Sequence, residues 1–438
     1  MRSMNQICKP TTLQFQKHQH FVQQWLASKN KKLLLFHGLG SGKTATSIHA
    51  AEGLLAVNEI RRVHIVTPAS LKKNYENELK SDLFKFKKIP ESYSIKSYQG
   101  FLKGATKAEL QNSLVVIDEV QNIVSSEGIL YKKFYNLLVT DAPNNMYVLV
   151  LSGTPMFDRV HEIALTINLL GPKQPLPVAE FYKRYTKGKE LINQEDFMER
   201  TNLYVSAFKG ISPVAYASRT DSTIVCKMSK HQENAYRGAV DGIDLNNVSY
   251  SQAFLSGPRM ASNLVYKNKG FGKGYRPTNK TLLKHFKADL AVYSAKFAKC
   301  VKMLKSSKKK AFIYSNFVES GGIVDFELAL KSAGIHSFGR FMSGQDEHNS
   351  AIVKKFNSGK IRIILGSPAM KEGISLKGCR EVHILDPYWN NSRTEQIIGR
   401  AIRFCSHASL AKHSRNVHVY HYVSHIDRKK TVDKHIMH

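Results

Sequence analysis

The chain has 438 residues, enough for two ordinary domains or three small ones, and its 42% hydrophobic and 23% charged residues exclude a fibrous or disordered protein. It carries 65 Lys and Arg against 34 Asp and Glu, a formal net charge of +31. A positive field of this size favours a polyanionic partner, nucleic acid above all. A basic surface kept for solubility, or for anionic lipid, would have the same composition.

The cysteine pattern bears on the cellular compartment. The five cysteines lie far apart and include no C-x-x-C pair. They are Cys8, Cys226, Cys300, Cys379 and Cys405. This pattern argues against a disulfide framework and a structural zinc site, and it favours a reducing compartment. No apolar run approaches the ~18 residues that span a membrane, and the N-terminus has no hydrophobic signal core, so we expect an intracellular protein without a membrane partner.

Short apolar runs bounded by turn residues predict two sets of β-strands. The first set occupies 32–36, 63–67, 114–118 and 146–152. The second set occupies 311–315, 361–367, 381–385 and 417–423. Because these runs are rich in Leu, Ile and Val and barely alternate, they indicate parallel sheets covered on both faces. The region of roughly 170–285 shows no clear strand and is predicted to be mainly helical. Ligands are expected just beyond the carboxyl ends of the strands.

A glycine-rich stretch, "GLGSGKT", follows the first predicted strand and leads into a helical pattern. Glycines let the backbone approach a phosphate closely, and the N–H groups at a helix start attract anions. Lys43 would then reach the β- and γ-phosphates, and the Thr44 hydroxyl would hold Mg²⁺. His37 stands where the full phosphate-loop pattern has glycine. The alternative is a chance glycine-rich turn.

Two adjacent carboxylates, Asp118 and Glu119, end the third predicted strand. This arrangement suits Mg²⁺ coordination by Asp118 and polarisation of a water molecule by Glu119. The alternative is an exposed acidic pair at a helix cap.

Near the other end of the chain, "TEQIIGRAIR" predicts an amphipathic helix. Gln396, Arg400 and Arg403 fall at i, i+4 and i+7 and form one stripe, while the isoleucines occupy the opposite arc. Guanidinium groups stabilise charge on a transferring phosphoryl group. By spacing alone, a solvated basic face is the favoured explanation of the stripe.

Two basic segments lie outside these motifs. The window 267–287 has seven Lys or Arg, no acidic residue and three interleaved aromatic residues, which suits either a loop touching nucleic acid or a linker. The stretch "KSSKKK" at 305–310 leads into a strand and is expected to be simply exposed.

In order along the chain, these motifs resemble those of superfamily 2 helicase motors on the Swi/Snf-like side. Within that group the chain most resembles the nucleoside triphosphatase, early transcription factor and helicase proteins of large nucleocytoplasmic DNA viruses. The resemblance rests on "FQKHQHFVQQWL", "GLGSGKT", "VTPASLKKNYENEL", "SYQGF", "DEVQN", "LSGTP", "FIYSNF", "GSPAMKEGISL" and "VHILDPYWNNSRTEQIIGRAIRFCSH". One departure is Gln121, where many relatives carry His, so how strictly movement depends on ATP stays open.

The resemblance implies an α/β fold of two RecA-like parallel-sheet domains with a mainly helical insertion between them. The first lobe would span 1–169, the insertion 170–285 and the second lobe 286–438. ATP and Mg²⁺ are the implied cofactors.

The resemblance also implies roles for individual residues. The implied catalytic residues are Glu119, Gln396, Arg400 and Arg403. The implied nucleotide-binding residues are Gln19, Gly38, Gly40, Ser41, Gly42, Lys43, Thr44 and Gly373, with Thr44 and Asp118 on the metal. The implied nucleic-acid contacts are Thr67, Ser70, Tyr98, Ser315, Asn316, Ser367 and Trp389.

The function implied is a nucleic-acid-dependent ATPase that translocates on, or unwinds, DNA in viral transcription or genome maintenance. An RNA helicase, and a basic packaging protein that binds nucleotide without hydrolysing it, are the alternatives. Viral RNA polymerase and other transcription factors are candidate partners. The host cytoplasm, a viral factory, the nucleus or the virion are candidate locations, and a monomer is the default.

Overall fold

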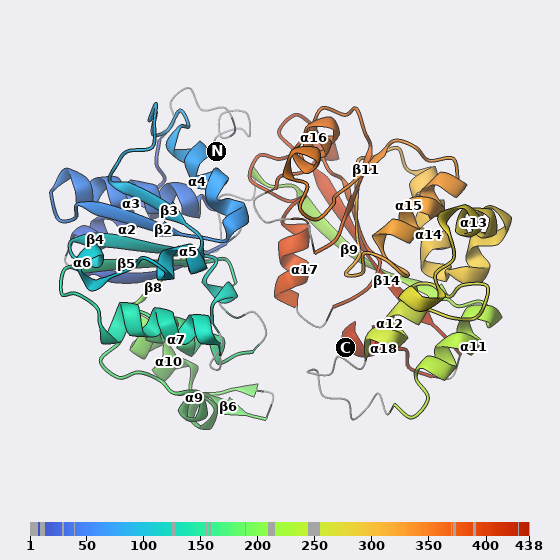
Figure 1. The fold of residues 1–438 in the computed structure, drawn as a ribbon, viewed down its shortest axis with the longest axis horizontal. Helices are drawn as coiled ribbons and strands as arrows, with labels where there is room; N and C mark the ends of the chain where they lie inside the picture. The colour runs from blue at the N-terminus through green and yellow to red at the C-terminus, as the bar shows by residue number, and fades with distance from the viewer. Residues whose placement is uncertain are drawn as a thin grey trace. The chain divides into compact units, whose positions relative to one another are not determined.

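Two six-stranded parallel sheets organise the computed structural model of this protein (Figure 1). One sheet belongs to a unit formed by Lys9–Ser212, and the other belongs to a unit formed by Pro213–His438 together with Cys8. The structure describes residues 8, 14–28, 30–38, 40–124, 128–154, 156, 159–188, 190–208, 215–243, 255–368, 370, 374–388, 391–427 and 429–437.

The first sheet has the strand order β3-β2-β4-β5-β1-β8. Its strands are β1 (Lys32–His37), β2 (Arg62–Val66), β3 (Tyr93–Lys96), β4 (Ser113–Asp118), β5 (Met146–Ser152) and β8 (Val205–Phe208). Every residue of the central strands β4 and β5 is buried, which explains why both read as continuous apolar runs.

Helices cover both faces of the first sheet. One face packs against α2 (Lys17–Ala27), α3 (Lys43–Ala56) and α4 (Lys72–Leu79). The other face packs against α5 (Tyr98–Leu102), α6 (Lys107–Leu110), α7 (Ile129–Tyr135) and α8 (Glu162–Asn168). Beyond them lie α9 (Val178–Tyr185), the hairpin of β6 (Thr186–Lys187) and β7 (Glu190–Leu191), and α10 (Gln194–Thr201).

The second sheet has the order β11-β12-β10-β13-β14-β9. Its strands are β9 (Ser218–Lys227), β10 (Ala311–Tyr314), β11 (Phe338–Arg340), β12 (Ile363–Gly366), β13 (Glu381–Ile384) and β14 (Asn416–His425). One face packs against α13 (Asn279–Tyr293), α14 (Ala295–Ser306) and α15 (Ile323–Ser332), and the other against α16 (Asp346–Asn357) and α17 (Asn391–Ile398). A smaller cluster joins α11 (Lys230–Ala239), α12 (Ser256–Asn263) and α18 (Val432–Met437).

The structure contains all eight predicted strands and further strands that the sequence analysis did not predict. The short strands β3 and β11 were missed in the two predicted sets, and the segment 170–285 carries β6, β7, β8 and β9 although no clear strand was expected there. β9 is an edge strand with mostly exposed or half-buried residues, so it lacks an apolar run. Because β8 joins the first sheet and β9 joins the second, this segment is divided between the two units at 212/213 instead of forming an insertion with boundaries at 169/170 and 285/286.

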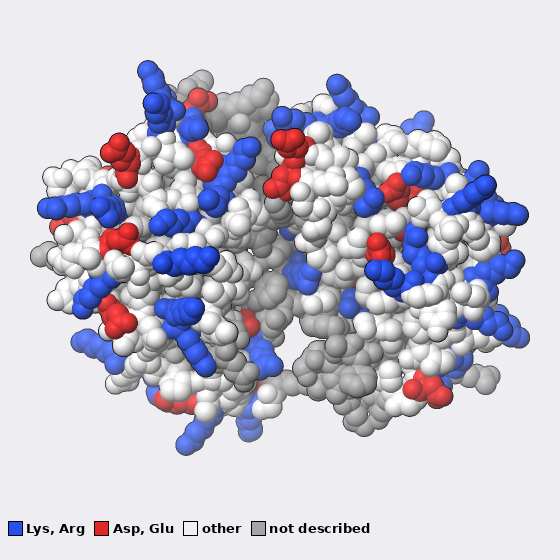
Figure 2. Space-filling view, in the orientation of Figure 1, with Lys and Arg blue, Asp and Glu red and all other residues white. Residues whose placement is uncertain are grey.

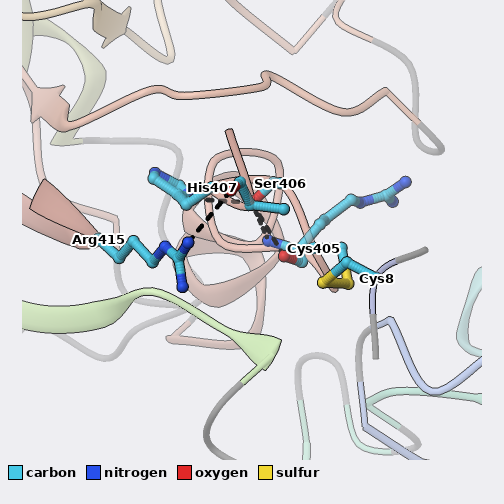
Figure 3. Close-up of a disulfide and its surroundings, with 7 residues drawn as sticks. Cys8, Cys405, Ser406, His407 and Arg415 are labelled. Carbon is cyan, nitrogen blue, oxygen red and sulfur yellow. Dashed lines mark hydrogen bonds between the residues drawn. A yellow bond between two sulfur atoms is a disulfide. The ribbon is translucent and has the colours of Figure 1, made fainter. Parts of the chain in front are cut away.

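The structure pairs Cys8 with Cys405, contrary to the expectation of unpaired cysteines (Figure 3). The two cysteines are 397 positions apart in sequence, and their Cα atoms are 5.5 Å apart. Cys226, Cys300 and Cys379 are buried and unpaired. Spacing along a chain cannot reveal a pair that only the folded backbone brings together.

The basic residues are spread over the visible surface of both units, with fewer acidic residues among them (Figure 2). This distribution agrees with the broad positive field expected from the net charge of +31. No helix in the described ranges is long and apolar enough to cross a membrane.

Candidate nucleotide-binding site

The loop between β1 and α3 has the backbone shape that an anion site needs. Gly40 and Gly42 have φ values of 76° and 80°, a left-handed conformation that favours glycine. Gly42 is the N-cap of α3, and no side chain caps the helix. The Gly38 N–H donates to the Phe208 carbonyl oxygen on β8 (2.8 Å), which fixes the start of the loop. An uncapped helix start behind a tight glycine turn is suited to binding phosphate.

His37 is the last residue of β1 and explains the departure from the phosphate-loop pattern. Its side chain is fully buried, and Nε2 lies 2.9 Å from the Ser206 hydroxyl on β8. Burial, with His18 and Lys43 nearby, lowers the pKa of His37 to about 3. The neutral ring therefore anchors the strand beneath the loop.

Lys43 folds back over the loop that precedes it. Its Nζ donates to the carbonyl oxygens of His37 (2.8 Å) and Gly38 (3.4 Å). A phosphate oxygen forms a stronger, charge-assisted bond with an ammonium group than a neutral carbonyl does. Lys43 can therefore exchange these carbonyls for a phosphate while keeping its position.

The helix α2 places two further side chains against the loop. Gln19 is buried, and its Nε2 lies 3.5 Å from the Gly42 carbonyl oxygen, while its Oε1 accepts from the Gln16 N–H (2.8 Å). His18 Nε2 lies 3.0 Å from the carbonyl oxygen of Ser41, and its ring stacks on Phe208. The structure thus brings Gln19 to the loop, and it adds His18, which the motif comparison did not single out.

The two predicted carboxylates, Asp118 and Glu119, lie at the end of β4, and the charge of Lys43 affects the pKa of Asp118. The Glu119 N–H donates to Asp118 Oδ1 (3.0 Å), and Glu119 adopts a left-handed backbone with φ of 51°. Burial and the adjacent Glu119 carboxylate raise the pKa of Asp118 to about 7, and the Lys43 ammonium group opposes that rise. A divalent cation at Asp118 would favour the ionised carboxylate.

Residues of this site fit a magnesium ion and a nucleotide. The Thr44 hydroxyl in the first turn of α3 and the Asp118 carboxylate are oxygen ligands of the kind that Mg²⁺ prefers. In the described ranges, no group of three or more His, Cys, Asp and Glu side chains could hold a metal by itself. Mg²⁺ is usually bound through one or two protein ligands plus substrate phosphates.

Glu119 is connected to the end of β5 by a chain of hydrogen bonds. Gln121 Nε2 donates to Glu119 Oε2 (2.6 Å), and the Ser152 hydroxyl donates to Gln121 Oε1 (2.7 Å). The Thr154 N–H donates to the same hydroxyl oxygen (2.9 Å). Gln121 therefore links "DEVQN" directly to "LSGTP". Its amide serves as donor and acceptor at once, which a neutral His can also do.

Tyr98 supports the backbone of the two carboxylates, and its predicted contact with nucleic acid stays a prediction. Its side chain is buried, and its hydroxyl donates to the carbonyl oxygen of Asp118 (2.6 Å), with the Glu119 carbonyl oxygen at 3.0 Å. In this structure the hydroxyl therefore has its hydrogen-bond partners within the protein. Its position in "SYQGF" gave no information on the direction of the side chain.

The predicted arginine stripe is not on one continuous helix. α17 ends at Ile398, because Gly399 follows and the chain continues in tight turns such as Ala401 N–H to Ile398 carbonyl (2.9 Å). Gln396 lies on α17, whereas Arg400 and Arg403 follow it. The Ser406 hydroxyl lies within 3.1 Å of the carbonyl oxygens of Ala401 and Arg403, which holds these turns. The predicted packing face is present: Ile397, Ile398 and Ala401 are buried.

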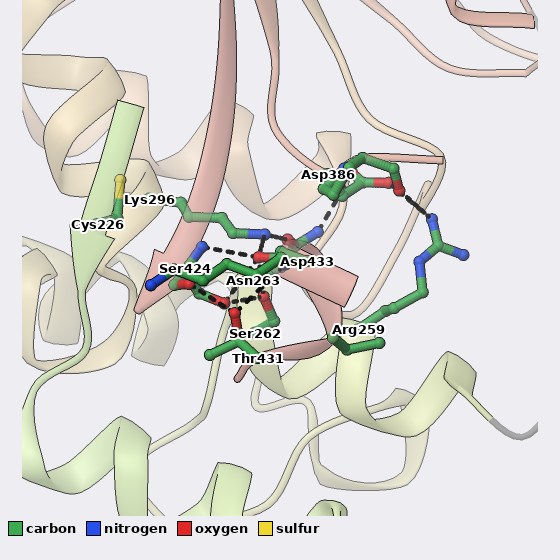
Figure 4. A network of polar contacts seen from close by, with 12 residues as sticks. Cys226, Arg259, Ser262, Asn263, Lys296, Asp386, Ser424, Thr431 and Asp433 are labelled. Atoms are coloured by element: carbon green, nitrogen blue, oxygen red, sulfur yellow. Dashed lines mark hydrogen bonds and ion pairs between the residues drawn. The ribbon is translucent and has the colours of Figure 1, made fainter. Parts of the chain in front are cut away.

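The second sheet places the predicted Ser315 and Asn316 around the buried carboxylate of Asp386, which Figure 4 shows beside Arg259. Asp386 follows β13 and accepts from the hydroxyl of Ser315 (2.6 Å) and from the side chain of Asn316 (2.7 Å). Arg259 on α12 lies 3.4 Å from the same carboxylate. Ser315 and Asn316 therefore have a hydrogen-bond partner within the protein, and their contact with a phosphate stays a prediction.

The remaining predicted contacts differ in exposure. Thr67 and Ser367 are buried, and Ser70 is half-buried in a short turn at Ala69–Leu71. Gly373 and Trp389 lie outside the described residues. For all of these, contact with nucleotide or nucleic acid stays a prediction.

Together, a glycine turn, a lysine and paired carboxylates at the carboxyl edge of a parallel sheet define a nucleoside triphosphatase. Comparisons with known proteins give the family. A model of the helicase conserved C-terminal domain matches residues 295–405. The "Putative ATP-dependent RNA helicase R563" of Acanthamoeba polyphaga mimivirus is 35% identical over all of this chain and 87% of that protein.

Two further similarities have lower sequence identity. Nucleoside triphosphatase I of Amsacta moorei entomopoxvirus is 25% identical over 99% of this chain and 77% of that protein. The SWI2/SNF2 ATPase core of Sulfolobus solfataricus, solved in complex with dsDNA, is 18% identical over 94% of this chain and 88% of that chain, with a TM-score of 0.42. The chain belongs to a family of viral helicases, as its motifs predicted.

Proposed function

We propose that the protein is an ATPase driven by nucleic acid, which couples ATP hydrolysis to translocation along DNA or to its unwinding, in viral transcription or genome maintenance. The observation that carries this proposal is the hydrogen-bonded chain from Glu119 through Gln121 to Ser152 and Thr154. It connects the carboxylate assigned to the attacking water with a segment outside the nucleotide loop, as coupling requires.

In this proposal the side chains have distinct tasks. Lys43 binds the terminal phosphates of ATP, and Thr44 and Asp118 hold Mg²⁺, which neutralises phosphate charge when bound. Glu119 orients and polarises the attacking water. Arg400 and Arg403, from the second unit, stabilise charge on the transferred phosphoryl group. Gln396 assists them.

An RNA helicase is the second candidate, and a specific observation favours it. The mimivirus relative at 35% identity is named as an RNA helicase, whereas nucleoside triphosphatase I carries no polymer in its name. A packaging protein that does not hydrolyse ATP is disfavoured, because Lys43, Asp118 and Glu119 are all competent and lie at one sheet edge. Viral RNA polymerase or another transcription factor would supply site selection, in the host cytoplasm or a viral factory.

Steady-state ATP hydrolysis with Mg²⁺ tests the proposal. It is measured alone and with single-stranded DNA, duplex DNA or RNA, for wild type, Lys43→Ala and the exposed control Lys132→Ala. We expect one polymer to stimulate wild type and the control equally, and Lys43→Ala to be inactive. If RNA alone stimulated hydrolysis, the polymer along which the protein moves would be RNA and not DNA. Hydrolysis that no polymer changes would overturn the motor proposal.

A further inference from the structure

A basic hollow of about 800 Å³ lies at the amino-terminal edge of the second sheet. It is formed by the end of α14, the segment leading into β10, the start of β13 and part of β14. Its cationic lining is Lys299, Lys302, Lys308, Lys309, Lys310 and Arg380. Ser315 and Asn316 follow the carboxyl end of β10, and Ser367 follows that of β12, so the hollow lies at the opposite edge of the sheet from these predicted contacts.

Several of these cations have no internal partner of opposite charge. Lys299, Lys302 and Lys308 are exposed, and none of them forms an ion pair with a carboxylate in the described part of the chain. Lys310, in contrast, donates to the carbonyl oxygens of Lys377 (2.9 Å) and Asn357 (3.3 Å). The first three ammonium groups are therefore available to an external anion.

Glu381 is the acidic residue of the lining, and one of its two oxygens is hydrogen-bonded. The Ser307 hydroxyl donates to its Oε1 (2.7 Å), and Lys309 Nζ and His383 Nε2 lie 3.8 Å and 3.7 Å from the carboxylate. Burial would raise the pKa of Glu381, but the neighbouring His383, Ser307 and Lys309 lower it overall. One carboxylate does not cancel the charge of six cations.

Arg362 holds the backbone of the basic segment 305–310 in place by hydrogen bonds. Its guanidinium donates to the carbonyl oxygens of Leu304 (3.1 Å), Ser307 (3.0 Å) and Lys309 (3.2 Å). These bonds hold the turn between α14 and β10, and they offset the negative partial charge at the carboxyl end of α14. The lysines thus project from a fixed backbone.

The hollow also contains apolar and aromatic surface. Tyr420 of β14 lines it together with Met303 and Leu410, and Tyr420 is half-buried. Lysines around an aromatic and apolar wall match a nucleotide unit, with phosphate on the cations and a base on the ring. Bases of a duplex are stacked inside the helix, so only an unpaired strand can present one here.

We propose that this hollow binds the backbone and an unpaired base of a single-stranded nucleic acid segment, as a contact additional to the motor's main track. This proposal rests on the proposed function, because the strand bound in the hollow is taken to belong to the same polymer along which the motor moves. It also assigns a role to 305–310, which the sequence analysis expected to be simply exposed.

Fluorescence anisotropy with a labelled single-stranded oligonucleotide tests the site. The variant Lys299→Ala/Lys302→Ala/Lys308→Ala is compared with Lys354→Ala/Lys355→Ala/Lys360→Ala, a charge-matched control of exposed lysines in the same unit. We expect the first variant to bind about tenfold more weakly, with the salt slope reduced by roughly 2, because each lost phosphate contact removes about 0.7 from it. The control is expected to keep the wild-type affinity within about twofold. Equal affinity and salt slope in the two variants would overturn the proposal.

Further arms separate the alternatives. Tyr420→Leu is expected to weaken single-strand binding without changing the salt slope, and ultraviolet crosslinking of wild type is expected to label the peptide that contains Tyr420. Crosslinks confined to other peptides would contradict the site. The site would also be contradicted if Lys299→Ala/Lys302→Ala/Lys308→Ala lost binding of inorganic triphosphate but kept wild-type binding of the oligonucleotide. Failure of the proposed function would show separately, as wild-type hydrolysis that no polymer stimulates.

Discussion

The carboxyl edges of the two sheets are built differently, although both sheets have six parallel strands. At the first edge, the ammonium group of Lys43 donates to the carbonyl oxygens of His37 and Gly38, and burial raises the pKa of Asp118 to about 7. At the second edge, Asp386 bonds Ser315 and Asn316. The first edge keeps charged groups that a ligand can recruit, whereas the second uses its polar groups to hold the protein together.

A buried network continues from the second edge into the helices (Figure 4). Asn263 lies between Asp386 (3.3 Å) and the fully buried Lys296 (2.9 Å). Lys296 forms an ion pair with Asp433 at 2.6 Å, and Asp433 also accepts from the Ser424 hydroxyl (2.7 Å). We therefore expect substitutions at the first edge to change activity, and substitutions in this network to change stability.

The largest effect is expected at the first edge from Glu119→Gln. It should lower kcat by ~10²–10⁴-fold, the range for loss of a general base, while the protein stays folded and binds ATP. Polymer-stimulated hydrolysis is the measurement, with exposed Glu91→Gln as the control. Unchanged turnover would remove Glu119 from the water-polarising role.

In the buried network, Lys296→Met should lower the free energy of unfolding by about 3–5 kcal/mol, because it leaves Asp433 buried without its cation. Urea denaturation of the second unit measures this. The double variant Lys296→Met/Asp433→Leu should recover much of the loss, because it removes both charges. A loss below about 1 kcal/mol in the single variant would mean that the pair is not buried as described.

The bridge between the carboxylate and β5 gives an intermediate effect. Gln121→Ala removes a charge-assisted hydrogen bond to Glu119 and should reduce polymer-stimulated hydrolysis about tenfold, which corresponds to ~1.5 kcal/mol. Gln121→His should retain more activity, because an imidazole can also donate to the carboxylate and accept from Ser152. Equal loss in both variants would contradict the bridging role.

The smallest effect concerns acid stability of the first unit. Because the folded pKa of His37 is about 3, below its ordinary value of 6.5, the unfolded chain binds more protons between these values. Stability should therefore fall as the pH drops from about 6.5 toward 3. His37→Gln should unfold at a lower pH than wild type in an acid titration followed by circular dichroism, and exposed His336→Gln should match wild type.

Much of the fold follows from the sequence for a physical reason. Strands buried on both faces must be apolar throughout, so β4 and β5 were predicted, whereas the exposed edge strand β9 was not. At the site, the glycine turn with Lys43 and the pair Asp118–Glu119 were predictable, because each group consists of residues that are neighbours in the sequence.

Other features depend on long-range packing and could not be predicted. The direction of the Tyr98 hydroxyl, the pairing of Cys8 with Cys405, and the contact of Arg259 with Asp386 each join segments that the sequence leaves apart. The sequence analysis also missed the early end of α17 at Ile398, where the chain continues in tight turns.

The most direct test of a motor that uses both units is ATP hydrolysis by Arg403→Ala with the stimulating polymer, together with its affinity for ATP. Arg403 lies in the second unit, and Lys43 lies in the first. If the second unit completes the site, hydrolysis should fall ~10³-fold or more, and ATP affinity should change far less. Hydrolysis at the wild-type rate in this variant would contradict a shared catalytic site and confine the chemistry to the first unit.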